Sequence, residues 1–418
     1  MTESYTYIKN AKIIDGSLSS AKYGDILIKN AENGAKIVKI GKVELPKGAK
    51  IAVTDAKGAY ACPGFVDLRA HLCAKGSKRD ALAVAEAARA GGYSATLLCP
   101  DTLPTADTKD AFSEQKSTVN KSKSANFALL ADLTVSGLGA DVSDIKALME
   151  AGAVGFYDEG AASPRVLRDA MRECAKNGAA LFVKCAEKTL SGGVMNEGER
   201  AKQMKISATP SICEELALAK YLMLAKDTGC RLHVHCVSTK GAVQMIRQAK
   251  KDGVSVTCDT CPQYFSLTDD QILFKGSAAK VDPPLRAVDD VMAVIEGIAD
   301  GTIDAISTDH TPCDAMLKRR SLADAPFGMI MLETAFLIGI TTLVEKGHIS
   351  IYRLIDAMCH APMRILGMDD QGSVGINLFS LDGETYASKA LFAGAYSNSP
   401  FEGWHFSGKL IKYFPCNW

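Results

Sequence analysis

Two short motifs in this sequence carry side chains that could bind a metal ion. His233 and His235 form a His-x-His pair, and Cys258 and Cys261 form a Cys-x-x-Cys pair. Imidazole nitrogens and cysteine thiolates are the usual ligands of zinc in proteins. A four-thiolate zinc site needs a second cysteine pair of this kind, and the sequence has none. We therefore expect Cys258 and Cys261 to be core thiols.

Eight short apolar runs between residues 60 and 310 would position such side chains. They alternate with longer helical segments, and strands buried on both faces of a parallel sheet read as continuous apolar runs. The runs are Ala61–Leu68, Ser94–Cys99, Phe127–Val135, Ala153–Tyr157, Ala180–Cys185, Arg231–Val237, Ser255–Cys258 and Asp304–Ser307. The pattern predicts an α/β protein with a (β/α)₈ barrel, whose functional residues lie at the C-terminal ends of the strands.

The two ends of the chain have a different pattern. Tyr5–Ile14, Gly24–Ile28 and Ala35–Ile40 read as hairpin strands separated by Gly, Asn and Ser, and short strands recur from about residue 372 to 412. We predict that residues 1–58 and 370–418 form one small β domain beside a barrel of residues 59–369.

Charge and composition exclude several classes of partner. Lys and Arg total 48 and Asp and Glu total 48, so no net field attracts nucleic acid or an anionic membrane. The N-terminal MTESYTYIKN lacks the regions of a signal peptide, and no run of about 18 apolar residues is present. We expect a cytoplasmic protein in which the thirteen cysteines are reduced.

Seven motifs, in order along the chain, resemble those of the dihydroorotase family. Pro63 to Leu72 is similar to the family's strand-one motif PGFVDxHxHxR. The others are Cys99–Thr102 (family MPNT), Tyr157–Gly160, Val237–Gly241, Asp282–Arg286 (NPPLR), Thr308–Pro312 (TDHAP) and Ala325–Gly328. The resemblance implies an amidohydrolase-type barrel and the hydrolysis of a cyclic amide in pyrimidine biosynthesis.

The resemblance also implies a zinc centre, and most of its ligand positions are altered here. The family uses two strand-one histidines, a strand-four carboxylate or carboxylated lysine, histidines on strands five and six, and a strand-eight aspartate that acts as general acid/base. These positions read Arg69, His71, Glu159, Lys184, Cys236 and Asp309. Asp158 is the alternative strand-four residue. Only His71, Glu159, Cys236 and Asp309 could still bind metal.

Arg69 and Lys184 oppose metal binding at these positions. A unit positive charge about 4 Å from a dication repels it by roughly 8 kcal/mol at an effective dielectric of about 20. We therefore expect no cofactor, and we predict that the two cations pair with Glu159 and Asp309. Zinc would be present only if the site were remodelled.

The His-x-His pair is next to the family's ligand position, not on it. That position is Cys236, and successive residues of a strand point to opposite faces. We therefore predict that His233 and His235 point away from the barrel pore and pack in the core.

The positions that would bind the substrate carboxylate are also altered. The resemblance places an arginine, two asparagines and a histidine where this chain has Cys73, Asp101, Asp282 and Cys313. Acids and thiols would repel or fail to bind a carboxylate, so dihydroorotate is not the expected substrate. Arg286, Phe327 and Gly328 persist, and we attribute Arg286 and Gly328 to the structure of the barrel rim.

Three interpretations follow. The first is a non-catalytic dihydroorotase-like protein, because family members that have lost their zinc ligands act as structural partners of aspartate transcarbamoylase; we expect such a protein to form a homo-oligomer. The second is an active cyclic amidohydrolase with a remodelled site on His71, Glu159, Cys236 and Asp309. The third is a metal-free enzyme that uses Lys184 as base or nucleophile.

Overall fold

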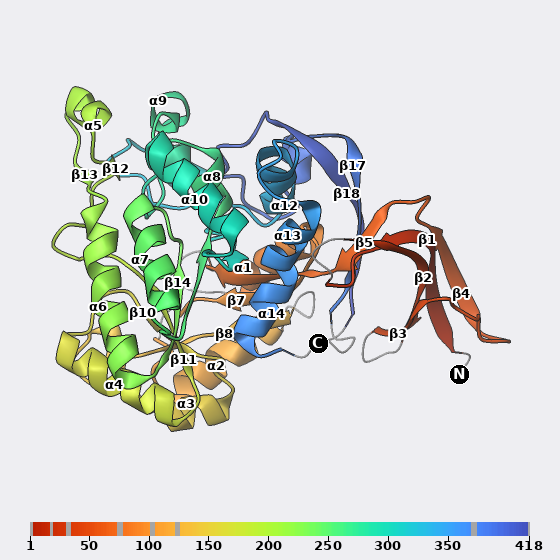
Figure 1. Ribbon diagram of the computed structural model, residues 1–418, viewed down its shortest axis with the longest axis horizontal. Coiled ribbons are helices and arrows are strands. Elements are labelled where there is room, and N and C mark those ends of the chain that lie inside the picture. The colour runs from red at the N-terminus through yellow and green to blue at the C-terminus, as the bar shows by residue number, and fades with distance from the viewer. Residues whose placement is uncertain are drawn as a thin grey trace.

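The computed structural model describes residues 3–16, 20–30, 35–72, 78–100, 105–121, 126–368 and 374–416 (Figure 1). Cys73 and Asp101 lie outside the described residues. Within the described part of the chain, no helix is long and apolar enough to cross a membrane.

Parallel strands form the barrel predicted from the sequence. They are β6 (Phe65–Ala70), β7 (Tyr93–Leu98), β8 (Asn126–Leu129), β9 (Ala131–Asp132), β10 (Phe156–Asp158), β11 (Ala180–Lys184), β14 (Arg231–His235), β15 (Val256–Thr260) and β16 (Ala305–Ile306). They run in two parallel sheets, β6-β7-β8 and β16-β15-β14-β11-β10-β9. A bridge between Ala70 and His310 joins the first strand to the end of the last, so the barrel closes. The (β/α)₈ prediction is confirmed, and each predicted run overlaps a strand.

Helices surround the barrel on its outer side (Figure 1). The longer ones are α1 (Lys78–Ala90), α2 (Lys109–Asn120), α3 (Ile145–Ala151), α4 (Pro164–Lys176), α6 (Ile212–Thr228), α7 (Lys240–Lys251) and α10 (Val288–Asp300). The shorter ones are α5 (Glu199–Met204), α8 (Pro262–Ser266), α9 (Gln271–Lys275), α11 (Ala315–Lys318), α12 (Ala335–Gly339), α13 (Ile351–Ile355) and α14 (Ala361–Leu366). In α4, the Ser163 side chain accepts a hydrogen bond from the Val166 amide, and Pro164 is the first helical residue. This cap fixes where the chain leaves β10 and turns back along the barrel.

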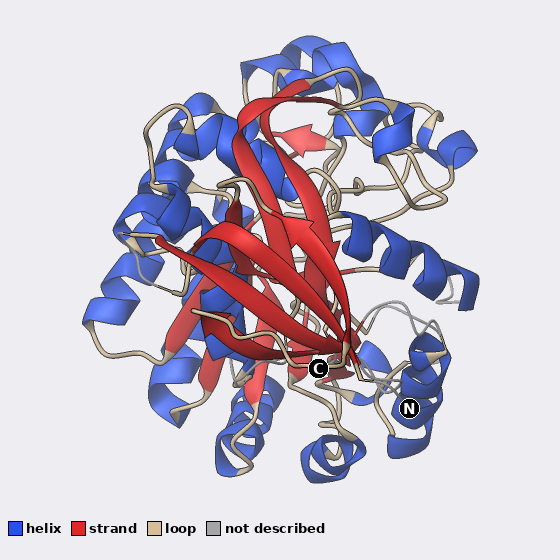
Figure 2. Ribbon diagram, turned by 90° about the vertical axis from the view of Figure 1, so that its right-hand side faces the viewer, coloured by secondary structure: helices blue, strands red, loops and turns tan. Residues whose placement is uncertain are grey.

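The β strands of the two chain ends form one sheet, which faces the viewer in Figure 2. Its order is β18 (His405–Phe414), β17 (Ile376–Tyr386), β5 (Tyr60–Pro63), β1 (Ser4–Ile13), β2 (Lys22–Asn30) and β3 (Lys36–Gly41). The strand β4 (Lys50–Asp55), which the sequence pattern did not predict, pairs parallel with β1. The two ends of the chain therefore meet through β17 and β5, while the exact domain boundaries stay a prediction.

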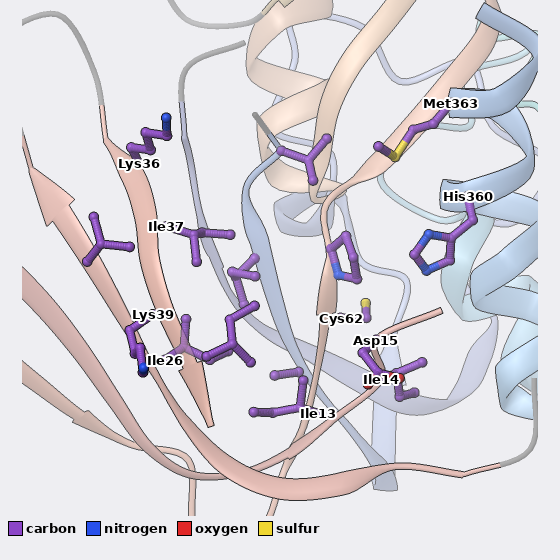
Figure 3. A pocket seen from close by; sticks show the side chains of 16 residues that line it. Ile13, Ile14, Asp15, Ile26, Lys36, Ile37, Lys39, Cys62, His360 and Met363 are labelled. Atoms are coloured by element: carbon purple, nitrogen blue, oxygen red, sulfur yellow. The ribbon is translucent and has the colours of Figure 1, made fainter. Parts of the chain in front are cut away.

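A cavity of about 510 Å³ lies where this sheet meets the barrel (Figure 3). Aliphatic side chains such as Ile13 and Ile37 line it from the sheet, and His360 and Met363 line it from the helical side. It shares no lining residue with the cavity at the barrel mouth. None of the residues that line the mouth cavity belongs to this sheet.

Candidate functional site at the barrel mouth

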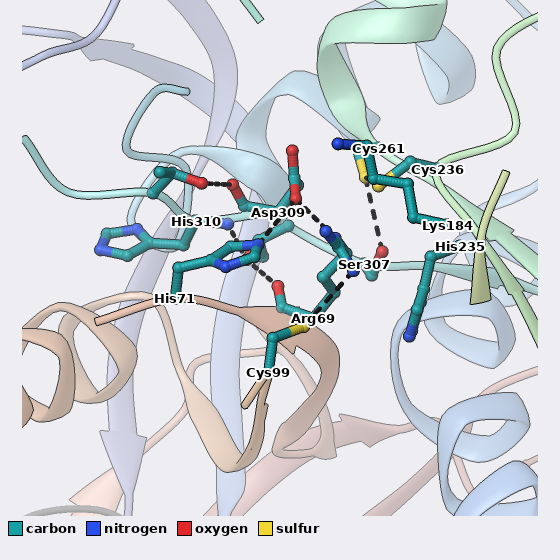
Figure 4. A network of polar contacts seen from close by, with 12 residues as sticks. Arg69, His71, Cys99, Lys184, His235, Cys236, Cys261, Ser307, Asp309 and His310 are labelled. Atoms are coloured by element: carbon teal, nitrogen blue, oxygen red, sulfur yellow. Dashed lines mark hydrogen bonds and ion pairs between the residues drawn. The ribbon is translucent and has the colours of Figure 1, made fainter. Parts of the chain in front are cut away.

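Arg69, on β6, pairs with the strand-eight aspartate inside the barrel mouth. Its Nε donates to Asp309 Oδ1 over 2.7 Å, and the two side chains are only 3% and 6% exposed. Its Nη1 also donates to the Tyr157 hydroxyl (3.1 Å) and to Cys99 Sγ (3.4 Å). His71 Nε2 lies 3.2 Å from the same Asp309 oxygen (Figure 4). The guanidinium therefore occupies the space in front of the carboxylate that would otherwise bind a metal.

Lys184, at the end of β11, makes a second group of ion pairs at the mouth. Its Nζ donates to Glu159 Oε1 over 2.7 Å and to Asp282 Oδ2 over 2.6 Å. The predicted pairing of both cations with Glu159 and Asp309 is confirmed, and Asp282 is an additional partner. The Asp158 carboxylate instead accepts hydrogen bonds from the Tyr221 hydroxyl of α6 and the Gly160 amide, so Glu159 is the strand-four residue of the site.

The charges of the cluster hold each other ionised. Burial disfavours the charged form of Asp309, but the hydrogen bond from His71 and the charge of Arg69 lower its pKa to about 2. Partial burial also opposes ionisation of Glu159, but the charges of Lys184 and Arg69 lower its pKa to about 2. Burial alone would lower the pKa of Lys184, whereas Asp282 and Glu159 raise it above the ordinary value. A lysine held in the charged form is neither a base nor a nucleophile, which argues against the third interpretation.

These shifts predict that the protein loses stability in acid. The folded-state pKa values of Asp309 and Glu159, about 2, lie below the ordinary values of 3.8 and 4.5. Their contribution to the free energy of unfolding is therefore complete above about pH 4.5, and it falls as the pH drops from about 4.5 to about 2. Denaturant unfolding at a series of pH values should show this decline. Asp252→Asn, a change at an exposed carboxylate outside the cluster, should leave the decline unaltered, while a flat profile would contradict the assignment.

The residues at the mouth do not fit a binuclear zinc centre. Two of its six ligand positions carry the buried cations Arg69 and Lys184. Both cations lie within hydrogen-bond distance of carboxylates that would be ligands. Each of the two cations would repel a divalent metal ion about 4 Å away by about 8 kcal/mol. The arrangement is a cluster of ion pairs at the positions where the family resemblance places metal ligands.

The side chains of His233 and His235 point to a different face of the barrel from the one predicted. Lys184 and His235 are paired in the parallel register of β11 and β14, so their side chains share one face, the inner one. His233 lies on that face too, since it is two residues away. The prediction that both histidines point away from the pore is wrong. Cys236 has a left-handed backbone (φ 57), which interrupts the alternation on which the prediction depended.

The inner histidines bind a buried carboxylate that the sequence did not single out. His233 Nε2 and His235 Nδ1 lie 3.1 and 2.7 Å from Asp259 Oδ2, on the adjacent strand β15. Cys236 Sγ lies 3.5 Å from Cys261 Sγ, which belongs to the Cys-x-x-Cys motif. The His-x-His and Cys-x-x-Cys motifs are visible in the sequence. Their contacts with Asp259 and Cys236 become apparent only in the fold.

The remaining substrate positions are occupied by structural contacts. Cys313 is buried, and its amide donates to Asn398 Oδ1. Arg286 is buried and donates to Ser238 Oγ and Asn196 Oδ1. At Gly328 (φ 101), a Cβ would lie 2.4 Å from Thr311 side-chain atoms. The structure thus supports a role for Arg286 and Gly328 in the barrel rim.

The open part of the mouth is an acidic cavity of about 390 Å³. It is lined by Asp132, Tyr157, Asp158, Glu159, Lys188, Asp282 and Phe327, among others. Four of these side chains are carboxylates, and the lysine Lys188 is exposed. Such a lining disfavours an anionic ligand such as a carboxylate substrate.

Known structures with the same architecture are cyclic-amide hydrolases. The chain is similar to L-hydantoinase from Arthrobacter aurescens, with a TM-score of 0.85 and 27% identity, covering 97% of this chain and 93% of that one. Dihydropyrimidinase from Brevibacillus agri has the same fold, with a TM-score of 0.80 at 22% identity over 98% and 94% of the chains. The class of the protein is therefore the amidohydrolase barrel.

Sequence comparisons define the family within that class. A family model described as "Dihydro-orotase-like" matches residues 58–242. The dihydroorotase of Staphylococcus aureus strain MRSA252 is 33% identical over 97% of this chain and 96% of its own length. The dihydroorotase of Bacillus subtilis strain 168 is 34% identical over 91% of this chain and 93% of its own length. The chain belongs to the dihydroorotase-like family of cyclic amidohydrolases.

Proposed function

We propose that this chain is a non-catalytic member of the dihydroorotase-like family that serves a structural or regulatory role in pyrimidine biosynthesis. The observation that carries the proposal is the buried pair between Arg69 and Asp309. Asp309 is the position that the family resemblance assigns to proton transfer. Here its carboxylate is bound by a permanent cation and has a pKa of about 2, so it is a poor base for chemistry near pH 7.

The substrate side of the mouth supports the same proposal. Asp282 binds Lys184, and the Cys313 amide binds Asn398, so neither position offers a donor to a carboxylate. Loss of the positioning groups alone would lower catalysis strongly, since positioning supplies much of the rate enhancement of enzymes.

A protein partner would give such a chain its role, and the family resemblance points to aspartate transcarbamoylase. We expect a mixture of this chain and the aspartate transcarbamoylase of the same organism to elute as one complex in size-exclusion chromatography with light scattering. Each protein alone is the reference, and the run with this chain alone also tests the expected homo-oligomer. Separate elution at micromolar concentrations, with transcarbamoylase activity unchanged, would remove this partner from the proposal.

The alternative is an active single-metal amidohydrolase on His71, Glu159, Cys236 and Asp309. One observation favours it: His71 remains beside Asp309, at 3.2 Å. The alternative requires Arg69 and Lys184 to leave buried carboxylate partners, which is costly when a charge is left unpaired. A turnover measurement separates the two proposals.

A further inference from the structure

Two cysteines that follow neighbouring strands meet beside Lys184 of the ion-pair cluster. Cys236 follows β14, and Cys261 follows β15. Their sulfur atoms are 3.5 Å apart, and both residues are fully buried (Figure 4). Two thiolates that bind one zinc ion at about 2.3 Å with a tetrahedral angle would be about 3.8 Å apart. The thiols are thus close to the separation that a shared metal ion requires.

A buried carboxylate completes the group and is already oriented. Asp259 has a ligand oxygen within 4.8 Å of both sulfur atoms. Its Oδ2 is bound by His233 and His235, and its Oδ1 accepts the Cys236 amide over 2.8 Å. Hydrogen bonds that fix a ligand in place are typical of the surroundings of protein metal sites.

The charges near the sulfur atoms distinguish this group from the mouth. Both thiols are fully buried, and burial disfavours a charged thiolate, so the thiols are neutral without an ion. A dication that displaces both thiol protons forms a metal dithiolate without net charge. With the Asp259 carboxylate as third ligand, the site then has one net negative charge. The charge of Arg69 lies close enough to Cys236 to stabilise its thiolate. By contrast, an ion on the other candidate group, His233, His235 and Asp259, would leave one net positive charge near the same arginine.

We propose that Cys236, Cys261 and Asp259 bind one thiophilic divalent ion, of the zinc or cadmium type, as a structural site at the C-terminal ends of β14 and β15. Binding converts M²⁺ and two thiols into a metal dithiolate and releases two protons, without any redox step. The site shares Cys236 with the family's ligand positions, but it differs from the family's centre because Cys261 and Asp259 are at none of those positions. Since both thiols are fully buried, the ion enters as the chain folds.

The experiment is metal analysis of the full chain purified from cells grown with added cadmium. We expect one cadmium ion per chain and a thiolate-to-cadmium charge-transfer absorption in the ultraviolet. Cys261→Ser should abolish both. The matched control is Cys258→Ser in the same motif, because Cys258 is equally buried but its Sγ contacts the Thr302 carbonyl instead; this variant should keep the ion.

Wild-type protein without cadmium, or cadmium retained in a folded Cys261→Ser variant, would overturn the proposal. If that variant does not fold, the cadmium-113 resonance of the wild-type protein decides, since a shift typical of nitrogen and oxygen ligands alone would also overturn it. The outcome is independent of the proposed function. A catalytic ion at the mouth would survive Cys261→Ser together with any turnover, whereas the thiol site would not.

Discussion

Arg69→Met is expected to lower the free energy of unfolding by about 3–5 kcal/mol, the cost of leaving one partner of a buried ion pair without its counter-charge. Arg69 and Asp309 are almost completely buried, so water cannot replace the lost partner. Methionine keeps the apolar stem of the side chain, which limits the effect of lost packing. Denaturant unfolding of the purified variant measures the change.

The matched control is an exposed arginine in a similar pair. Arg168 donates to Asp227 over 2.7 Å, but the two side chains are 44% and 41% exposed. Arg168→Met should therefore change the free energy of unfolding by only about 0–1 kcal/mol. Equal, small effects of the two substitutions would show that Asp309 is solvated and that the cluster is not closed.

The triple variant Arg69→His, Lys184→His and Cys236→His is expected to bind zinc at the barrel mouth. It removes two charges that each repel a dication by roughly 8 kcal/mol at about 4 Å, and it adds three imidazoles beside His71. Two of these positions already face the site, because Arg69 and Lys184 contact its carboxylates. Zinc content of the purified variant measures the result.

Cys236→His alone is the control, because it adds an imidazole but keeps both repelling charges. It should bind no zinc at the mouth. A folded triple variant without zinc would contradict the alignment of these positions with metal ligands. Turnover of dihydroorotate by the triple variant should stay low, since Asp282 and Cys313 still offer no donor to a carboxylate.

The sequence predicted the barrel well because its signals are local. Each strand is an apolar run, and the cap of α4 is a local Ser-Pro signal confirmed by the contact of Ser163 with Val166. The strand β4 was missed because its residues are mostly exposed, as the partly polar run Lys50–Asp55 shows. The backbone hydrogen bonds of its parallel pairing with β1 hold this strand in the sheet, although its sequence has no alternating apolar pattern.

The site was predictable only where family motifs fixed the position of a residue. The pairs of Arg69 with Asp309 and of Lys184 with Glu159 followed from ligand positions that converge on one point. Lys184 and Asp282 are 98 residues apart in the sequence, so no local sequence pattern could predict their contact. The direction of His235 was wrong because the left-handed backbone of Cys236 cannot be read from strand alternation.

Hydrolysis of dihydroorotate, assayed with added zinc on the full chain purified from zinc-supplemented cells, decides whether the barrel mouth holds a catalytic metal centre. If Arg69 and Lys184 replace the metal centre, turnover should not exceed that of the Asp309→Asn variant. Zinc-dependent turnover that Asp309→Asn abolishes would contradict the account and would establish an active amidohydrolase with a remodelled site.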